Sequence, residues 1–369
     1  MNVVVAGGGT GGHVFPALAA ATALRDTYGA AVTFVGARDG QEAVLVPAAG
    51  FPFVGLEVAA AQTRFSVAAM HAVWLALRGA RACGSLVAGS EAVVSIGGFA
   101  SAPAAIAARR TRTPLVLIEP NSVPGVVNRI AARWATAAAI TFEGTRARLP
   151  AGIRIERTGN PIRPEIAAIA EHRARLRAEA TAAFGLASDR TTVFVTGGSQ
   201  GARHLDEVLA AALPLLASRA DLQLLVATGP TNLAIVSDAI DPGADLRVSA
   251  IGFIERMDLA LALADVALSR AGGGVAELTA AGLPSILVPY PHATEHHQDA
   301  NARELVDAGA ARILRDQDLS SSVLAHAILD LVDDTEARRA MGASALRWSR
   351  PDAAEQIARL TIEVVGERG

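Results

Sequence analysis

Short apolar runs rich in β-branched residues alternate with longer segments of helical periodicity along the whole chain. Such runs are typical of strands buried on both faces, and the helical segments between them indicate βαβ units that build a parallel sheet. In the first half the predicted strands are Val3–Ala6, Val32–Val35, Phe53–Leu56, Ala92–Ser95, Leu115–Ile118 and Ala137–Thr141. In the second half they are Thr192–Val195, Leu222–Ala227, Leu246–Ala250, Val266–Ser269 and Ser285–Val288.

Between the two halves, a segment containing Pro161 and Pro164 follows the run Arg154–Thr158. Two prolines this close stop regular structure, so the segment is the best hinge candidate. The predicted fold class is α/β, with two Rossmann-like, doubly wound domains, residues 1–160 and 161–369, that face each other across a cleft. Ligands of such sheets bind at the carboxyl ends of the strands. From about Leu319 onward the pattern predicts helices.

The composition narrows the class of protein further. A chain of 369 residues is long enough for two cores, and its apolar residues are mainly aliphatic, because aromatic residues make up only 4%. The single cysteine, Cys83, excludes a disulfide framework and a cysteine metal cluster and fits a reducing compartment. The N-terminus does not read as a signal peptide, and no run of about 18 apolar residues occurs, so we expect a soluble or peripheral protein.

Charge is distributed unevenly between the two predicted domains. Residues 1–160 carry 14 Arg and 8 acidic residues, a net charge of +6, whereas residues 161–369 carry 19 Arg and 28 acidic residues, a net charge of −9. The basic first domain favours an anionic surface or an anionic substrate.

Within that basic domain, residues 64–81 have an apolar set at helical spacing with arginines at both ends. The set consists of Phe65, Met70, Val73, Trp74 and Leu77, and further cations nearby in the sequence are Arg109, Arg110, Arg112 and Arg133. One interpretation is a helix that dips into the membrane interface. The alternative is an ordinary helix whose apolar side faces the core.

The first candidate binding element is the turn Gly7-Gly8-Gly9-Thr10-Gly11-Gly12-His13, which follows the first predicted strand and opens a helix. Glycines let the backbone approach a ligand, and a helix N-terminus offers free N–H groups to an anion. A dinucleotide site also requires an acid at the end of the second strand, where Gly36 and Ala37 stand with Asp39 further on. The pattern therefore favours a phosphate or diphosphate cradle over a purely structural tight turn.

Two more glycine-rich turns occur in the second half. Thr196–Arg203 follows the first strand there and includes Ser199, a candidate hydrogen-bond donor to a phosphate. Ser269–Leu278 contains three consecutive glycines, Gly272 to Gly274, at a helix start. One turn into that helix, Glu277 is placed to accept hydrogen bonds from both hydroxyls of a ribose, and the alternative is a solvated helix glutamate.

Two patterns resemble metal sites but are weak. Asp316-Gln317-Asp318 lies just before a helix start, where Asp is an ordinary cap. The segment from His292 to His296 fits H-x-x-E-H, which requires both histidines on one helix face, yet the neighbouring prolines favour a loop. We therefore predict no metal or cofactor site, and a divalent cation stays open as an alternative.

Taken in order along the chain, these turns resemble the MurG family, the N-acetylglucosaminyl transferases that complete the lipid-linked peptidoglycan precursor. The resemblance covers nearly the whole chain and also rests on Gly97–Pro103, Glu119–Gly125, Gly159–Arg163 and His297–Ala302. It implies a GT-B architecture, inversion at the anomeric carbon and a last helix that packs back on the N-terminal domain. It further implies a peripheral enzyme at the cytoplasmic face of the inner membrane, with UDP-N-acetylglucosamine and a lipid-linked muramyl-pentapeptide as substrates and no nucleic acid partner.

The resemblance also assigns residues to the two substrates. Those implied for the donor are Arg163, Ser199, Phe253, Ile254, Gly272, Glu277 and Gln298, and those implied for the acceptor are Thr10, Gly11, Gly12, His13, Glu119 and Asn121. This chain departs from the family pattern at two places. The loop Ala271–Ala276 is one residue shorter, and Ile118 and Pro120 stand where a His and a Gln are common.

The implied reaction is attack of an acceptor hydroxyl on the anomeric carbon while UDP leaves, which requires a base and stabilisation of the diphosphate charge. His13 is the first candidate for the base, because a helix N-terminus disfavours its protonated form. Contact with an acceptor phosphate and a structural role are the alternatives for His13, and Glu119 is the reserve base. Competing functions are a UDP-N-acetylglucosamine 2-epimerase, another GT-B transferase and a non-catalytic nucleotide-binding protein.

Overall fold

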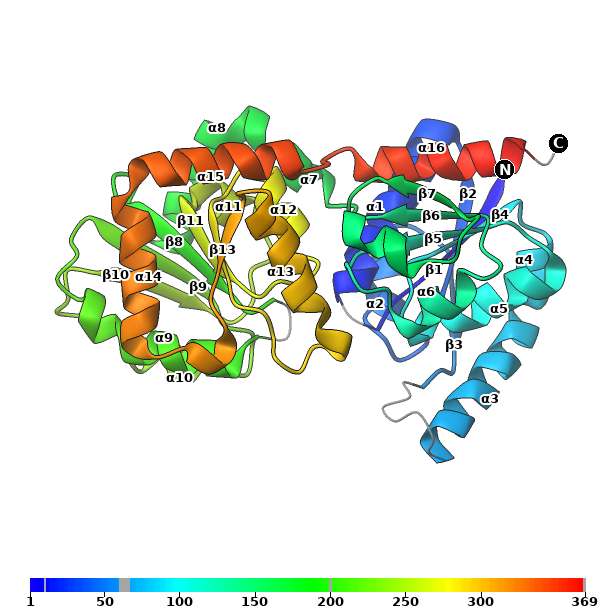
Figure 1. Ribbon diagram of the computed structural model, residues 1–369, viewed down its shortest axis with the longest axis horizontal. Helices are drawn as coiled ribbons and strands as arrows, with labels where there is room; N and C mark the ends of the chain where they lie inside the picture. Colours follow the sequence, from blue (N-terminus) through cyan, green and yellow to red (C-terminus); the bar gives the residue numbers. More distant parts are fainter. Residues whose placement is uncertain (10, 60–66, 199–200, 368–369) are drawn as a thin grey trace. The chain divides into compact units, whose positions relative to one another are not determined.

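The computed structural model describes residues 1–9, 11–59, 67–198 and 201–367, and the chain divides into two compact units (Figure 1). The N-terminal unit holds Met1–Arg163 together with the last segment, Arg350–Gly369. The C-terminal unit holds Pro164–Ser349. Each unit is built around a parallel sheet of its own.

The N-terminal sheet has seven parallel strands in the order β3-β2-β1-β4-β5-β6-β7. Its strands are β1 (Asn2–Ala6), β2 (Ala31–Ala37), β3 (Phe53–Leu56), β4 (Ala92–Ser95), β5 (Leu115–Glu119), β6 (Ala137–Ile140) and β7 (Arg154–Arg157). The order reverses between β1 and β4, so this pair forms the topological switch point at which ligands of doubly wound sheets bind. The strands predicted for this half are confirmed to within two residues at each end.

Helices cover both faces of this sheet. They are α1 (Gly11–Tyr28), α2 (Glu42–Ala48), α3 (Val67–Ala82), α4 (Gly84–Ala88), α5 (Ala102–Thr111), α6 (Val126–Ala131) and α16 (Ala353–Gly366), with 3-10 turns η1 (Phe99–Ser101) and η2 (Glu143–Arg148). Successive side chains of a strand point to opposite faces, so β1 sends Val3 and Val5 into one core and Val4 into the other. The first core lies under α1 and α16, where Leu360 is fully buried, and the second lies under α3 to α6.

The C-terminal sheet has six parallel strands in the order β10-β9-β8-β11-β12-β13, with its switch point between β8 and β11. Its strands are β8 (Thr191–Thr196), β9 (Leu222–Ala227), β10 (Arg247–Ile251), β11 (Val266–Ser269), β12 (Ser285–Leu287) and β13 (Ala311–Ile313). The predicted strands are again confirmed to within two residues. β13 is absent from the prediction, because its three residues, with charged Arg312 in the middle, form no apolar run of ordinary strand length.

The helices of the C-terminal unit continue the same alternation. They are α7 (Pro164–Ala167), α8 (Ile169–Phe184), α9 (Arg203–Leu216), α10 (Leu233–Ser237), α11 (Met257–Leu263), α12 (Val275–Ala280), α13 (His297–Asp307), α14 (Ser321–Asp333) and α15 (Thr335–Trp348), with 3-10 turns η3 (Thr294–His296) and η4 (Asp316–Asp318). The predicted helical tail after about Leu319 is confirmed by α14, α15 and α16. Across the described residues, no helix is both long enough and apolar enough to cross a bilayer.

The burial of α16 generates the first prediction. Replacing Leu360 by Ala should lower the free energy of unfolding by about 2–5 kcal/mol, because the change removes buried methyl groups and leaves a cavity beside β1 and α1. Leu77→Ala is the matched control, since Leu77 on α3 is 40% exposed. Urea unfolding of both variants provides the measurement. Equal and small effects would show that α16 does not belong to the core of the N-terminal unit.

Candidate functional site

The first glycine turn lies at the switch point of the N-terminal sheet. It leaves β1 after Ala6 and enters α1 at Gly11, and Gly9 has a φ of 90°, a conformation that favours glycine. Gly97 and Gly98, with φ of 84° and 74°, follow the neighbouring strand β4. Parallel strands end at the same edge, so the two turns meet, and a β-carbon built on Gly98 would lie 3.8 Å from Nε2 of His13.

His13 is thus a half-buried side chain in the first turn of α1, above the turn that follows β4. Gly11 is buried and Gly12 is exposed, so the start of this helix reaches the protein surface. Thr10, which is also predicted to contact the acceptor, lies outside the described residues. The tertiary structure therefore brings together His13, Gly11 and Gly12 with one segment that the sequence places far away, Gly97–Gly98.

The first turn also holds a buried carboxylate that the sequence analysis does not select. Glu42 is fully buried, and its two oxygens accept hydrogen bonds from N of Gly9 (2.9 Å) and N of Ala37 (2.8 Å). A dinucleotide site is expected to have an acid after the second strand, and Glu42 is such an acid, three residues beyond Asp39. In this fold, however, its carboxylate points into the glycine turn.

Glu119 ends β5 and organises the loop that follows. Its Oε1 accepts a hydrogen bond from N of Asn121 (3.0 Å), and its Oε2 accepts from N of Gly125 (3.0 Å) and Nδ2 of Asn128 (3.0 Å). Burial raises the pKa of Glu119 to about 7, although these hydrogen bonds act in the opposite direction. Asn121, an expected acceptor residue, is therefore held by Glu119, and Thr145 also donates to its carbonyl oxygen (2.9 Å).

Arg163 lies at the end of the hinge segment and contacts the first helix. Its guanidinium carbon is 5.1 Å from the centre of the Phe15 ring, within cation–π range. The Phe15 ring in turn lies against Gly11, since a β-carbon on Gly11 would be 3.3 Å from Cε2 of Phe15. Arg163, predicted to serve the donor, thus approaches the helix that carries the first glycine turn.

The second glycine turn follows β8 at the switch point of the C-terminal sheet. Gly198 donates to Oγ1 of Thr196 (3.1 Å), and Gly201 closes the turn by donating to the carbonyl oxygen of Gly198 (3.0 Å). A β-carbon on Gly201 would lie 2.3 Å from the carbonyl oxygen of Thr228, and its φ is 73°, so only glycine fits there. Ser199, the predicted diphosphate ligand, lies outside the described residues.

The third glycine turn follows β11, the partner of β8 at this switch point. Arg270 opens it and is largely buried, where it forms an ion pair with Asp316 and donates to the carbonyl oxygens of Val288 and Pro289. His204 of α9 contacts the other oxygen of Asp316 at 2.9 Å. The interpretation of Asp316 as a helix cap is wrong, because Ser320 caps α14 and Asp316 is the partner of Arg270.

Gln298, on α13, forms hydrogen bonds with the third turn. Its Oε1 accepts hydrogen bonds from N of Ala271 (3.2 Å) and N of Tyr290 (2.9 Å), and a β-carbon on Gly272 would lie 3.7 Å from its Nε2. Asn301, one turn further along α13, donates to the carbonyl oxygen of Ala271 (3.0 Å). The side chains of α13 therefore hold the short glycine loop and leave Nε2 of Gln298 beside Gly272.

The remaining predicted donor residues occupy two places on the C-terminal unit. Glu277 is half-buried in the first turn of α12, where its N–H bonds to the carbonyl oxygen of Gly274. Phe253 is 57% exposed and Ile254 is buried, and both follow the edge strand β10. The structure thus places Gly272 in the third turn, Glu277 in the helix that follows it and Gln298 of α13 against it. Phe253 and Ile254 follow a strand that lies two positions from β8 in the sheet.

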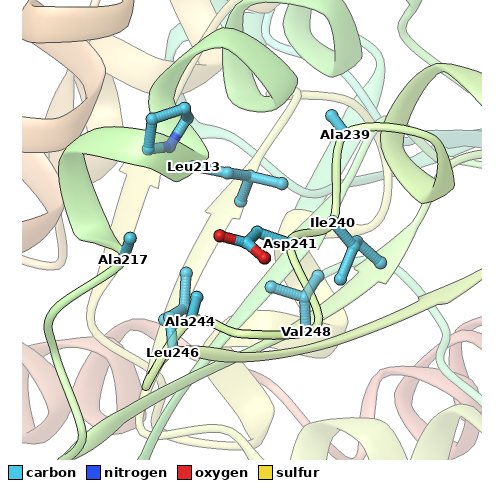
Figure 2. Close-up of a pocket in the computed structure, with 9 residues that line it drawn as sticks. Leu213, Ala217, Ala239, Ile240, Asp241, Ala244, Leu246 and Val248 are labelled. Carbon is cyan, nitrogen blue, oxygen red and sulfur yellow. The ribbon is translucent and has the colours of Figure 1, made fainter.

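Neither of the two weak metal patterns has the geometry of a site. His296 has a left-handed backbone, with φ of 53°, and precedes α13, so it shares no helix face with His292. In the described part of the chain, no three His, Cys, Asp or Glu side chains form a group that could hold a metal ion. A small, mainly apolar pocket does exist in the C-terminal unit, between the end of α9 and the segment that leads into β10, and Asp241 is one of the residues that line it (Figure 2). This pocket lies at the amino ends of the strands, opposite the glycine turns.

Comparisons with known proteins agree with this geometry. Models of the glycosyltransferase family 28 N-terminal and C-terminal domains match residues 3–140 and 192–357. A relative from Desulforamulus reducens, 35% identical over 99% of both chains, is named UDP-N-acetylglucosamine–N-acetylmuramyl-(pentapeptide) pyrophosphoryl-undecaprenol N-acetylglucosamine transferase. Among solved structures, Acinetobacter baumannii MurG has a TM-score of 0.77 at 27% identity, covering 98% of this chain and 99% of that chain.

A second solved structure shows whether the fold alone distinguishes a transferase from an epimerase. A putative UDP-N-acetylglucosamine 2-epimerase from Listeria monocytogenes has a TM-score of 0.71 at 15% identity, covering 100% of this chain and 97% of that chain. At this identity the likeness shows the fold alone. The predicted GT-B fold class is confirmed by the transferase neighbours, and the choice between transferase and epimerase depends on the sequence relatives instead.

Glu119 generates a prediction about pH. Between about pH 4.5 and 7 the folded chain keeps a proton on Glu119 that the unfolded chain has lost, so stability should fall as pH rises through this window, on the order of 3 kcal/mol in total. Glu119→Gln has no such proton and should show a flatter profile. The measurement is urea unfolding from pH 5 to 8, in which histidines contribute equally to both proteins. Parallel profiles would contradict the raised pKa.

Proposed function

We propose that this chain, which belongs to the MurG family of glycosyltransferase family 28, transfers N-acetylglucosamine from UDP-N-acetylglucosamine to the C4 hydroxyl of a lipid-linked N-acetylmuramyl-pentapeptide, with inversion. The observation that carries the proposal is the full-length match to relatives named for this transfer, at 35–40% identity. In peptidoglycan synthesis this step converts lipid I to lipid II. The chain is accordingly a hexosyltransferase.

Each unit carries the turns for one substrate in this proposal, and Arg163, the last residue of the first segment of the N-terminal unit, is the one donor residue outside the C-terminal unit. The C-terminal unit binds the UDP-sugar at the β8–β11 switch point, where the second and third turns offer backbone N–H groups to the diphosphate. Glu277 accepts hydrogen bonds from the ribose hydroxyls, and Gln298, beside Gly272, binds hydroxyls of the sugar. The backbone at Phe253 and Ile254 forms the hydrogen bonds that recognise the uracil. Ser199 and Arg163 bind the diphosphate, roles that rest on the family resemblance alone.

The N-terminal unit binds the acceptor at the start of α1. Thr10, Gly11 and Gly12 are assigned to its pyrophosphate, which the N–H groups and the dipole at the start of the helix stabilise. Asn121, on the loop held by Glu119, contacts the muramyl group. His13, above Gly98, removes the proton from the attacking C4 hydroxyl, and the helix N-terminus keeps its imidazole unprotonated.

The contacts of Glu119 bear on its candidacy as the base. Both of its oxygens are already used to hold the loop of Asn121 and Gly125. A carboxylate so occupied orients the acceptor loop better than it removes a proton from a substrate, so we assign the base to His13. The roles proposed here use no metal ion.

The function is tested by incubating the protein with radiolabelled UDP-N-acetylglucosamine and the lipid-linked acceptor. Transfer predicts label in the organic phase that extracts the lipid. A 2-epimerase would instead convert the nucleotide sugar without labelling the lipid, and a transferase with a soluble acceptor would leave the label in water. A non-catalytic protein would bind UDP without turnover, so any of these three results would refute the proposal.

His13→Ala should lower kcat by at least about 100-fold, because the attacking hydroxyl loses its general base. The dissociation constant of UDP should stay within about twofold, since the donor is assigned to the other unit. His326→Ala is the control, because His326 is exposed on α14 and its Nδ1 contacts the carbonyl oxygen of Ser322 in the same helix. Steady-state transfer and UDP titration provide the two readouts. Equal losses of rate and UDP affinity would exclude His13 as the base.

The N-terminal unit also carries a surface suited to the cytoplasmic face of the inner membrane. On α3 the side chains of Val67, Met70, Val73, Trp74 and Leu77 are exposed, between 40% and 78%. The interpretation of this helix as core-facing is therefore wrong for the described residues of the set, and Phe65 lies outside them. We define these five residues of α3 as the apolar face of α3.

Cations accompany this face. The Arg78 guanidinium lies 5.5 Å from the Trp74 ring, and Arg81 lies in the last turn of α3. Arg109 and Arg110 are at the far end of α5 from the contact of Gly79 with Pro103, where Arg109 stands over the Trp134 ring. Apolar side chains flanked by arginines suit the boundary between acyl chains and anionic headgroups. The placement supports peripheral binding, which would bring a polyprenyl-linked acceptor to the N-terminal unit.

Trp74→Glu should weaken binding to vesicles of phosphatidylglycerol and phosphatidylethanolamine by at least about tenfold, because it removes a large apolar side chain and adds a charge of the same sign as the lipid. Leu215→Glu is the control, since Leu215 is 53% exposed on α9 of the C-terminal unit. Co-sedimentation at two salt concentrations measures the effect. Unchanged binding in Trp74→Glu would refute this surface as the membrane contact.

A further inference from the structure

Glu42 connects the segments that follow β1 and β2, two neighbouring strands that end at the same edge of the sheet. It is the first residue of α2, and its side chain reaches the turn after β1 through N of Gly9 and the end of β2 through N of Ala37. Both carboxylate oxygens are thereby occupied by backbone donors, at 2.9 and 2.8 Å. A hydrogen bond from an N–H to a carboxylate is stronger than one between neutral groups, so these contacts hold the backbone firmly.

Three glycines provide the space for this carboxylate. A β-carbon on Gly8 would lie 1.9 Å from Oε1 of Glu42, one on Gly36 would lie 2.7 Å from Cγ, and one on Gly40 would lie 2.3 Å from Oε2. Burying a carboxylate costs free energy even when it is hydrogen-bonded. The fully buried Glu42 therefore depends on the space left by these three glycines and on its two hydrogen bonds to offset the cost of burial.

The turn that Glu42 holds is the one that supports His13. The carbonyl oxygen of Gly8 and the imidazole of His13 both lie against Gly98, at 3.6 and 3.8 Å from its would-be β-carbon. The ring of Phe99 lies against Gly9, 3.2 Å from where a β-carbon would be. A change in the path of Gly8 and Gly9 would therefore alter the start of α1 and the surroundings of its histidine.

The same contact explains why the glycine pattern is not a dinucleotide site. Gly9 is the second glycine of G-x-G-x-x-G, the position at which the backbone of a dinucleotide site approaches the pyrophosphate. Here its N–H is donated to Glu42, which also places a negative charge beside the turn. The anion is therefore assigned to the start of α1, at Gly11 and Gly12.

We propose that Glu42 is a positioning residue for the acceptor site, which fixes the first glycine turn so that His13 and the first N–H groups of α1 face the acceptor. The proposal rests on the function proposed above. It adds a residue that touches neither substrate and acts only through the backbone of the turn.

Glu42→Gln tests the carboxylate with little change of shape. The amide group turns a donor toward either Gly9 or Ala37, so one of the two N–H groups loses its acceptor. Because small displacements of reacting groups lower rates steeply, we expect kcat/KM for the lipid acceptor to fall by at least about tenfold. KM for UDP-N-acetylglucosamine should stay within about twofold, since the donor turns are in the other unit.

Gly40→Ala provides a second, independent variant. It keeps the carboxylate but displaces it, because the new methyl group would lie 2.3 Å from Oε2 of Glu42. Gly40 has no positive φ, so the backbone accepts alanine. We expect the same selective loss of acceptor kcat/KM. Glu91→Gln is the matched control, since Glu91 also accepts a backbone N–H of β1, from Asn2, but at the exposed opposite end of the strand.

Hydrogen–deuterium exchange of residues 7–15 gives a readout that does not depend on transfer. Exchange there should become faster in both site variants and stay unchanged in Glu91→Gln. If the wild type labels no lipid, the proposed function fails while the exchange result still tests the turn. If the wild type is active and both variants keep acceptor kcat/KM, or lose donor and acceptor parameters equally, the positioning role of Glu42 is refuted.

Discussion

The parallel pairing of one central strand pair in each unit determines where the chemistry of this protein lies. Ala6 of β1 pairs with Ser95 of β4, and Ser269 of β11 pairs with Thr196 of β8, so the four glycine-containing turns that follow leave their sheets side by side in two pairs. Main-chain hydrogen bonding fixes this register, and a shift by one residue would turn the buried Val and Leu side chains to the wrong faces. The candidate sites thus depend on the same bonds that hold the cores.

The two units hold the segments at their strand ends with groups of opposite hydrogen-bonding character, acceptors in one and a donor in the other. In the N-terminal unit, buried carboxylates accept N–H groups, Glu42 in the turn after β1 and Glu119 in the loop after β5. In the C-terminal unit, the cation of Arg270 donates to carbonyl oxygens and pairs with Asp316. Glu42, Glu119 and Arg270 are all buried, whereas Gly12 and Gly274 at two of the helix starts are exposed. A turn meant to bind phosphate needs rigid, unoccupied N–H groups, and buried ionic contacts provide that rigidity without using the binding face.

The surface of α3 follows a different physical rule from the turns. Its apolar side chains are exposed although buried Leu75, Gly79 and Ala80 already attach the helix to the unit. Leaving Trp74 and Met70 in water brings no gain in stability, and this exposed row with Arg78 beside Trp74 is what supports the membrane contact proposed above. For an enzyme proposed to use a lipid-linked acceptor, that contact belongs with the acceptor unit.

The sequence by itself determined the strands, the doubly wound fold, the three glycine turns and the helical spacing of Met70, Val73, Trp74 and Leu77. These features depend on side-chain periodicity and on the conformational freedom of glycine, both of which can be read from short segments of the sequence. Only the tertiary structure decided that Glu42 enters the turn of Gly9, that Glu119 holds the loop of Asn121, and that Asp316 pairs with Arg270 instead of capping a helix. Glu42 and Asp316 meet partners 33 and 46 residues away, and a spacing of that length carries no geometric signal until the sheet has brought the strand ends together.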